Sequence, residues 1–112
     1  MIQLNNENKF QEIDFLDTFI GLVDGSKCKT IDAFYKEISL ALQFPDYFGE
    51  NLDALDDMLS DLGWIYQTAI ILIITNYKDL LAFESAELQK ELTNLLSTIN
   101  QECFEIIVID KS

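Results

Sequence analysis

Apolar residues follow two different spacings along this chain, and the spacings predict strands that alternate with helices. Three short runs, apolar at almost every position, predict the strands: Phe19–Val23, Ala69–Ile74 and Glu105–Ile109. Apolar residues at helical spacing predict the helices between them: one capped by Thr30, one from about Asn51 to Leu62, a short one at Tyr77–Phe83 and one capped by Ser85. This order predicts an α/β fold, a small three-stranded parallel sheet covered by helices.

The predicted helix from Asn51 to Leu62 has two chemically opposite faces. At about 100° per residue, four leucines fall together on one side: Leu52, Leu55, Leu59 and Leu62. Four aspartates, which we call the acidic face, fall on the other: Asp53, Asp56, Asp57 and Asp61. We expect the leucines to pack on the core and Gly63 to take the left-handed conformation that ends the helix.

The acidic face lowers the local stability of the predicted helix. Asp53, Asp57 and Asp61 are four residues apart, and repulsion at that spacing costs roughly a few tenths of a kcal/mol per pair. No lysine occurs between Lys36 and Lys78 to offset it. A solvated helix face is the alternative, but such a face normally interleaves both signs of charge. The pattern therefore favours a functional anionic surface.

Aromatic residues border the acidic face. Tyr47 and Phe48 precede the helix, and Trp64 follows it. Because Tyr and Trp are common anchors at protein interfaces, Tyr47 and Trp64 are candidate partner contacts, with core packing as the alternative for each. For Phe48 we predict core packing.

The charge of the chain narrows the choice of partner. The net charge is −13, from 20 acidic residues and seven lysines, with no arginine and no histidine. The chain therefore lacks the commonest general base and the guanidinium clamp for phosphates. Its field repels nucleic acid and attracts cations. We expect a basic protein partner, no nucleic acid, no cofactor and no enzymatic activity.

Other site chemistry is not favoured by the sequence. Aspartates stacked along a helix do not converge as calcium ligands do, so no metal site is expected. Cys28 and Cys103 are predicted to be free, packed thiols. The longest apolar run, Ala69–Ile74, is too short for a membrane span, and residues 1–6 lack the features of a secretory signal. We expect a single cytoplasmic domain, residues 1–112, in which residues 1–18 form an extension of uncertain structure.

The stretch Phe44–Leu59, FPDYFGENLDALDDML, resembles the barstar family of intracellular ribonuclease inhibitors and immunity proteins. The resemblance is densest at Pro45, at Tyr47, over residues 49–55 and at Asp57. It implies a barstar-like fold. It also implies that the chain binds a cognate basic ribonuclease toxin, one to one, and seals its active site with the acidic helix and the loop before it.

The resemblance also implies roles for individual residues. Asp57 would take the place of a substrate phosphate, and the other matched interface positions are Tyr47, Gly49, Asn51 and Asp53. Asp56, Asp61 and Trp64 complete the predicted partner-binding set as their neighbours.

Two departures from the family concern the identity of the partner. Asp56 stands where barstar has a tryptophan, and residues 95–100 contain no acid to match the carboxylate of barstar's third helix. We therefore expect a ribonuclease toxin other than barnase. The alternative is a different basic partner, such as a deoxyribonuclease, held by the same polyanionic face.

Overall fold

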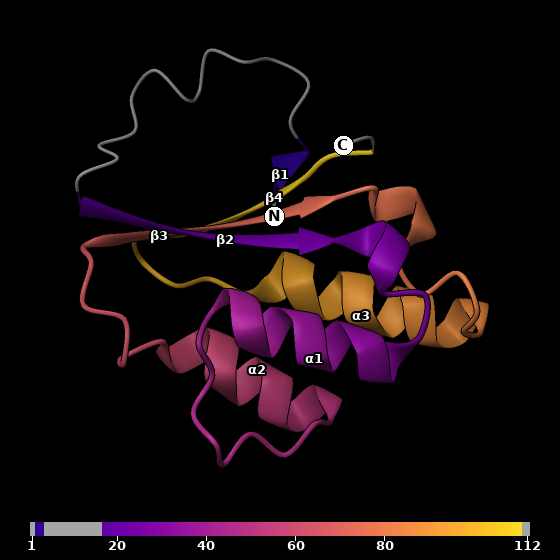
Figure 1. The fold of residues 1–112 in the computed structure, drawn as a ribbon, viewed down its shortest axis with the longest axis horizontal. Helices are drawn as coiled ribbons and strands as arrows, with labels where there is room; N and C mark the ends of the chain where they lie inside the picture. Colours follow the sequence, from indigo (N-terminus) through magenta and orange to yellow (C-terminus); the bar gives the residue numbers. More distant parts are fainter. Residues whose placement is uncertain (1, 4–16, 111–112) are drawn as a thin grey trace.

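The computed structural model describes residues 2–3 and 17–110, which form a parallel sheet with helices on one side (Figure 1). The strands are β1 (Ile2–Gln3), β2 (Thr18–Asp24), β3 (Ala69–Thr75) and β4 (Phe104–Val108), in the order β1-β4-β3-β2. In the register, Thr18 pairs with Ala69 and Ile70 with Phe104. The three predicted strands are confirmed.

The sheet also has a strand that the hydrophobic pattern did not predict. β1 pairs with β4 through Ile2 opposite Ile107. Two residues are too few to show a period-2 pattern, so this strand leaves no signal in the sequence. The remaining part of the expected N-terminal extension up to residue 16 lies outside the described residues.

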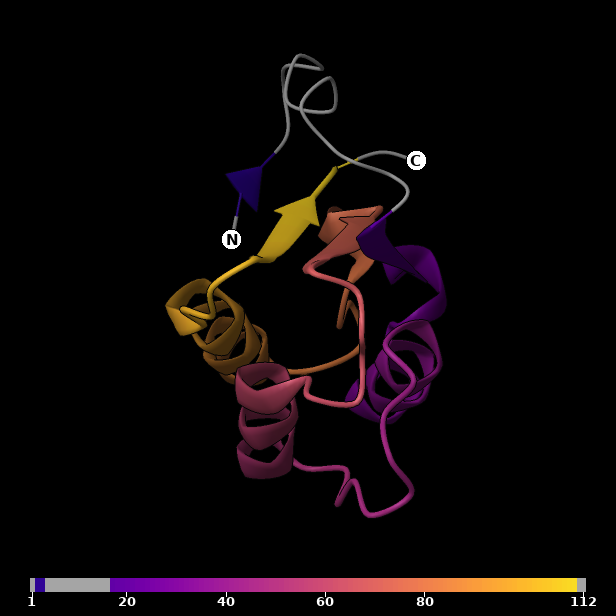
Figure 2. The same cartoon turned by 90° about the vertical axis from the view of Figure 1, so that its left-hand side faces the viewer.

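Three α-helices cover one face of the sheet, as Figure 2 shows. They are α1 (Ile31–Ala41), α2 (Leu52–Asp61) and α3 (Ala86–Thr98). In Figure 1, α2 lies farthest from the sheet, below α1 and α3. Within the described residues, no helix has the length and apolar character needed to cross a bilayer.

Two short 3₁₀-helices, η3 (Gly25–Lys27) and η4 (Tyr77–Asp79), follow β2 and β3. The predicted helix at Tyr77–Phe83 is therefore too long. Leu81 takes a left-handed φ of 59°, and the N–H groups of Leu81 and Phe83 donate to the carbonyls of Cys28 and Lys29 at 2.8 and 2.9 Å. Those donors are thus used in pairing with a distant segment instead of in a helix.

The two predicted helix caps are confirmed. The Thr30 hydroxyl accepts a hydrogen bond from the Ala33 N–H at 3.3 Å, and the Ser85 hydroxyl accepts one from Leu88 at 3.1 Å. The Glu84 carboxylate accepts a further bond from the Ile31 N–H at 2.8 Å. The first N–H groups of a helix have no partner within the helix, and these bonds satisfy two of them at the start of α1 and one at the start of α3.

The core lies between the sheet and the helices. Alternate residues of β3 and β4 face it, together with the buried stripes of the helices: Ile70, Leu72, Ile74, Phe104, Ile106, Val108, Phe34, Ile38, Leu55, Leu59, Leu92 and Leu96. In the helix after Ser85, apolar residues at helical spacing predict a buried stripe of Leu88, Leu92, Leu95 and Ile99. Leu92 is buried, the other three are partly buried, and the fully buried Leu96 was missed.

The two cysteines differ in their surroundings. Cys28 is fully buried, as predicted, and desolvation raises the pKa of its thiol to about 12. Cys103 is exposed, so the prediction of a packed thiol is wrong for it. The residue occupies a left-handed turn position, with φ 63°, just before β4, and its side chain is turned away from the core.

Asp24 links the ends of β2 and β3. Its Oδ1 accepts hydrogen bonds from the Asn76 amide at 2.9 Å, from the Ser26 hydroxyl at 2.7 Å and from the Ser26 N–H at 3.0 Å. These donors, Asn76 first, favour the carboxylate and lower the pKa of Asp24 below its ordinary 3.8.

The lowered pKa predicts a specific acid sensitivity. A carboxyl whose pKa is lower in the folded than in the unfolded state stabilises the fold above the unfolded pKa, and this contribution is lost as the pH falls through the folded pKa. From pH 5 to pH 3, we expect urea denaturation to show a larger loss of unfolding free energy for the wild type than for Asp24→Asn. Asp79→Asn, an equal charge change at an exposed site, should behave as the wild type. Equal losses in all three proteins would contradict the role of Asp24.

Candidate functional site

Asn51 fixes the start of α2 and joins it to the preceding loop. Its backbone is extended, with φ −144°, and its Oδ1 accepts a hydrogen bond from the Ala54 N–H at 2.8 Å. Its Nδ2 donates to the Gly49 carbonyl at 3.3 Å. The side chain thus caps the helix and also holds the loop against the helix start.

The two predicted faces of α2 are confirmed. Leu55, Leu59 and Leu62 are buried in the core and Leu52 packs against it. Met58, which lies on the same side, is also buried. All four aspartates of the acidic face are exposed. The helix therefore presents carboxylates outward from a surface that its leucines hold in place.

The four carboxylates differ in what they bind inside the fold. Asp61 Oδ1 accepts a hydrogen bond from the Gly63 N–H at 3.2 Å, and Asp56 Oδ1 accepts a long one, 3.4 Å, from the Ser60 hydroxyl. No side chain or N–H group in the described part of the chain donates to the carboxylates of Asp53 and Asp57. These two therefore have their full acceptor capacity available for a partner.

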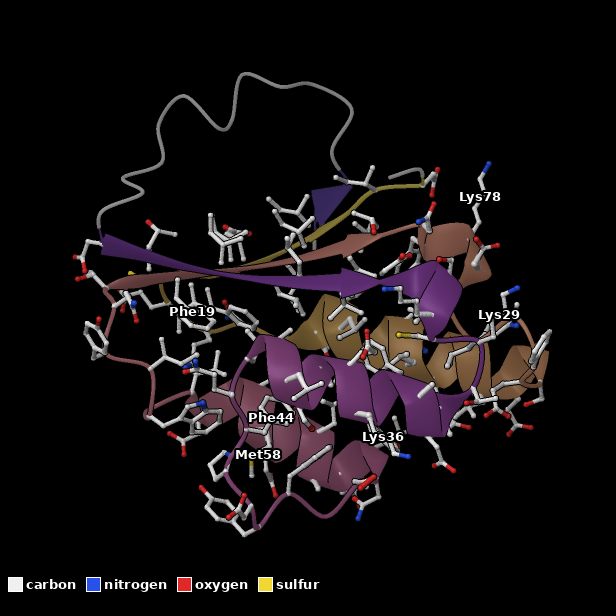
Figure 3. The ribbon with its side chains drawn as sticks, viewed as in Figure 1. Phe19, Lys29, Lys36, Phe44, Met58 and Lys78 are labelled. Carbon is white, nitrogen blue, oxygen red and sulfur yellow. The ribbon has the colours of Figure 1, made fainter. Side chains whose placement is uncertain are left out.

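Lysines are distant from α2 in the sequence, and two of them are also distant from it in the structure. In Figure 3, Lys29 and Lys78 lie at the right-hand end, away from Phe44 and Met58, whereas Lys36, on α1, lies near α2 in this view. Neither α2 nor the loop before it contains a lysine. The anionic field of α2 is thus not neutralised from within its own segment.

The loop between α1 and α2 combines packed and exposed aromatic rings. Phe48 makes edge-to-face contacts with Tyr35 and Phe44, with ring centroids 5.7 and 4.9 Å apart. Its predicted core packing is confirmed. Tyr47, next to it, is 70% exposed. The loop therefore holds Tyr47 outward on a packed base, beside the start of the acidic helix.

Backbone strain occurs in the same loop. Glu50 has a left-handed φ of 49°, a conformation that non-glycine residues adopt at a cost of about 1 kcal/mol or more. Gly49 itself has no positive φ, and a Cβ there would meet Asn51 and Ala54 only at ordinary contact distances. The fold therefore does not require glycine at position 49, and a partner contact at its backbone stays a prediction.

Trp64 is used mainly inside the fold. Its indole N–H donates to the Leu42 carbonyl at 2.8 Å, and its ring meets Phe44 edge-to-face at 5.9 Å. The residue is only half-buried, so an exposed edge remains for a partner. A partner contact by Trp64 stays a prediction, limited to that edge.

The end of α2 differs from the sequence-based prediction. Leu62, and not Gly63, takes the left-handed conformation, with φ 54°. Its side chain is 2% exposed, and burying a leucine contributes roughly 1.5–3 kcal/mol. This gain is enough to offset the cost of a left-handed L-residue, roughly 1–2 kcal/mol. The C-terminal end is also held by Gln101, whose Nε2 donates to the Asp61 carbonyl at 2.7 Å. No signal in the sequence indicated this bond.

The site offers no arrangement for a metal ion. Within residues 17–110, no three or more acidic, cysteine or histidine side chains are grouped as metal ligands would be. The carboxylates of α2 run along the helix, which suits a row of separate donors on a partner surface more than one central cation.

Comparison with known proteins connects this geometry to a family. The sequence profile of the family described as "Barstar (barnase inhibitor)" matches residues 19–106, which include β2, all three helices and the acidic face. A Bacillus subtilis (strain 168) protein named "Putative ribonuclease inhibitor YrdF" is 35% identical over 57 residues. These residues are 51% of this chain and 59% of that protein, so the chain matches less than two thirds of the relative's length.

Proposed function

Because this chain belongs to the barstar family, we propose that it inhibits a basic ribonuclease by occluding the active site with the acidic face. One observation carries the proposal: Asp53 and Asp57 are exposed on a helix anchored by buried leucines, and no donor from the described part of the fold occupies them. A preformed row of unpaired carboxylates suits a surface of fixed cations.

The chemistry of the partner explains the choice of residues. A ribonuclease active site gathers cationic groups that hold phosphate and stabilise developing negative charge. Carboxylates on a helix satisfy these groups without presenting a bond that the enzyme can cleave. Asp57, in the middle of the face, takes the place of a substrate phosphate, and Asp53 and Asp56 contact neighbouring cations.

The flanking residues serve as secondary contacts. Tyr47 is the aromatic anchor because its ring is exposed on a packed loop. Gly49 and Asn51 bring the loop backbone close to the partner. Asp61 and Trp64 contribute less, since each already uses a polar atom within the fold.

The partner we propose is a cognate ribonuclease toxin other than barnase, bound one to one in the cytoplasm. The protein acts as an inhibitor and not as an enzyme. The test is a pair of cleavage assays, one with a fluorescent RNA substrate and a panel of basic ribonucleases that includes barnase, the other with a fluorescent DNA substrate and basic deoxyribonucleases. We expect loss of ribonuclease activity at an equimolar ratio for at least one enzyme. Inhibition of deoxyribonucleases alone, or of no nuclease, would overturn the proposal.

The proposal predicts a strong dependence of association on salt. Charges on the acidic face are exposed, and the screening length falls from about 30 Å at 10 mM salt to about 3 Å at 1 M. The association rate constant with the inhibited ribonuclease should fall on the order of 10- to 1000-fold over this range, while dissociation changes less. Stopped-flow fluorescence of Trp64 or of the enzyme measures both rates. Association that is insensitive to salt would point to an apolar interface.

A further inference from the structure

The C-terminal end of α2 is the part of the helix that its own charges destabilise most. Asp61 is the last residue of the helix, where the partial negative charge of the helix dipole disfavours a carboxylate, and Asp57 lies one turn before it. They also repel each other, because they are four residues apart. In addition, the last carbonyls of any helix lack partners within the helix. Without support from elsewhere, this end would fray.

Hydrogen bonds from distant segments support this end of the helix. The Gln101 amide, from the segment between α3 and β4, donates to the carbonyl of Asp61, the last residue of α2, at 2.7 Å. The Trp64 indole donates at 2.8 Å to the Leu42 carbonyl, so it joins the chain after α2 to the end of α1. The partners are 40 and 22 residues apart in the sequence. Both bonds are between a side-chain N–H and a backbone carbonyl.

We propose that Gln101 is a positioning residue for partner binding, because it clamps the last turn of α2 and so fixes the carboxylates of the acidic face. The claim that Gln101 affects partner binding rests on the proposed function. The clamp supplies a donor to a carbonyl at the negative end of the helix, where the aspartates add further negative charge. Trp64 is the second part of the clamp.

A clamp of this kind affects binding because it keeps the end of α2 ordered, and this effect needs no contact between the clamp and the partner. A helix whose C-terminal end frays presents Asp61, and Asp57 one turn before it, in many positions, and a partner must then fix both carboxylates during association. A helix held before association avoids that cost, so the carboxylates meet the enzyme's cations in the geometry they need. Loss of the clamp should therefore weaken binding through the loss of order in α2, without requiring a contact between Gln101 and the partner.

The chain offers a matched control at another glutamine. Gln89, in α3, donates from its Nε2 to the Leu81 carbonyl at 2.8 Å and, more weakly, to the Glu84 carbonyl at 3.4 Å. Like Gln101 it is half-buried, but neither of its acceptors belongs to α2. Gln101→Met and Gln89→Met each remove a side-chain amide and keep the length of the side chain. Gln89→Met should lose at least as much global stability as Gln101→Met, because the bonds of Gln89 are part-buried and that of Gln101 is exposed.

Hydrogen exchange tests the clamp without any partner. In the full-length free protein, we expect the backbone amides of residues 58–62 to exchange roughly 2- to 10-fold faster in Gln101→Met than in the wild type. Gln89→Met should leave these amides unchanged. Trp64→Phe, which keeps the aromatic ring and removes the N–H, should accelerate the same amides. Unchanged exchange at residues 58–62 in Gln101→Met would overturn the proposal.

Binding then tests whether the clamp positions the acidic face. The probe is the ribonuclease of the panel that the wild type inhibits, used at low ionic strength, where attraction between opposite charges is least screened. We expect Gln101→Met to bind roughly 2- to 10-fold more weakly than the wild type, and Gln89→Met to bind as the wild type does. Equal affinities for the two variants would show that Gln101 is structural only. If the wild type binds no ribonuclease, the proposed function fails, while the exchange result still decides whether the clamp exists.

Discussion

Replacing Asp57 with alanine should weaken binding to the inhibited ribonuclease by about 100- to 10,000-fold. The estimate follows from about 3–5 kcal/mol for removing one partner of a buried ion pair, which leaves the other charge desolvated and unpaired. Asp57 is exposed in the free protein and lies on the side of α2 opposite its buried leucines. Only the complex would bury it, so the free protein should keep its stability.

Isothermal titration calorimetry of the wild type, Asp57→Ala and Asp79→Asn measures this effect. Asp79 is an exposed acid in η4, away from the acidic face, and its substitution changes the net charge by the same amount. We expect Asp79→Asn to lose less than about 3-fold in affinity, through weaker long-range attraction alone. If Asp57→Ala bound as tightly as Asp79→Asn, Asp57 would not be a phosphate mimic.

Replacing Leu59 with alanine should lower the free energy of unfolding by about 2–5 kcal/mol. Leu59 is fully buried on the core side of α2, so its removal loses apolar contact and leaves a cavity. A domain of this size is stable by roughly 5–15 kcal/mol in total, so this single change removes a large share. Urea denaturation followed by far-ultraviolet circular dichroism measures the loss.

Leu40 provides the control for this substitution. It lies on α1 with 75% of its surface exposed, so Leu40→Ala should change stability by no more than roughly 0.5 kcal/mol. Similar stabilities for the Leu59 and Leu40 variants would show that α2 is not packed through its leucine stripe.

Periodicity in the sequence predicted those parts of the fold in which neighbouring residues decide the outcome. The strand at Ala69–Thr75 and the leucine stripe of α2 follow from local spacing, and the caps at Thr30 and Ser85 follow from short-range hydrogen bonding. The opposition of leucines and aspartates on α2 is a property of helical geometry alone, and it was correct.

The errors occurred where distant contacts outweigh local preference. Glycine is the usual left-handed residue at a helix end, but burial of Leu62 in the core shifts that role one position earlier. Leu81 ends the short helix early because its N–H pairs with Cys28. Neither contact is visible from spacing, since each depends on which segments the fold brings together.

In the candidate site, too, features set by local spacing could be predicted and features set by distant contacts could not. The positions of Asp53, Asp56 and Asp57 on one exposed face could be predicted, because helical spacing sets them. The bond from Gln101 to α2 could not, because its partners are 40 residues apart. The internal hydrogen bonds of Trp64 and Asp61 were likewise hidden, and they reduce what these two residues can offer a partner.

The position of α2 away from the sheet bears on how such a protein can evolve. Substitutions on the outward side of this helix change no buried contact, so they can accumulate without a loss of folding (Figure 1). A nuclease that alters its active-site surface can therefore be followed by changes at positions such as Asp56, while the leucines beneath stay the same. Under the proposed function, the residues that determine which nuclease is bound are therefore separate from the leucines that keep the chain folded.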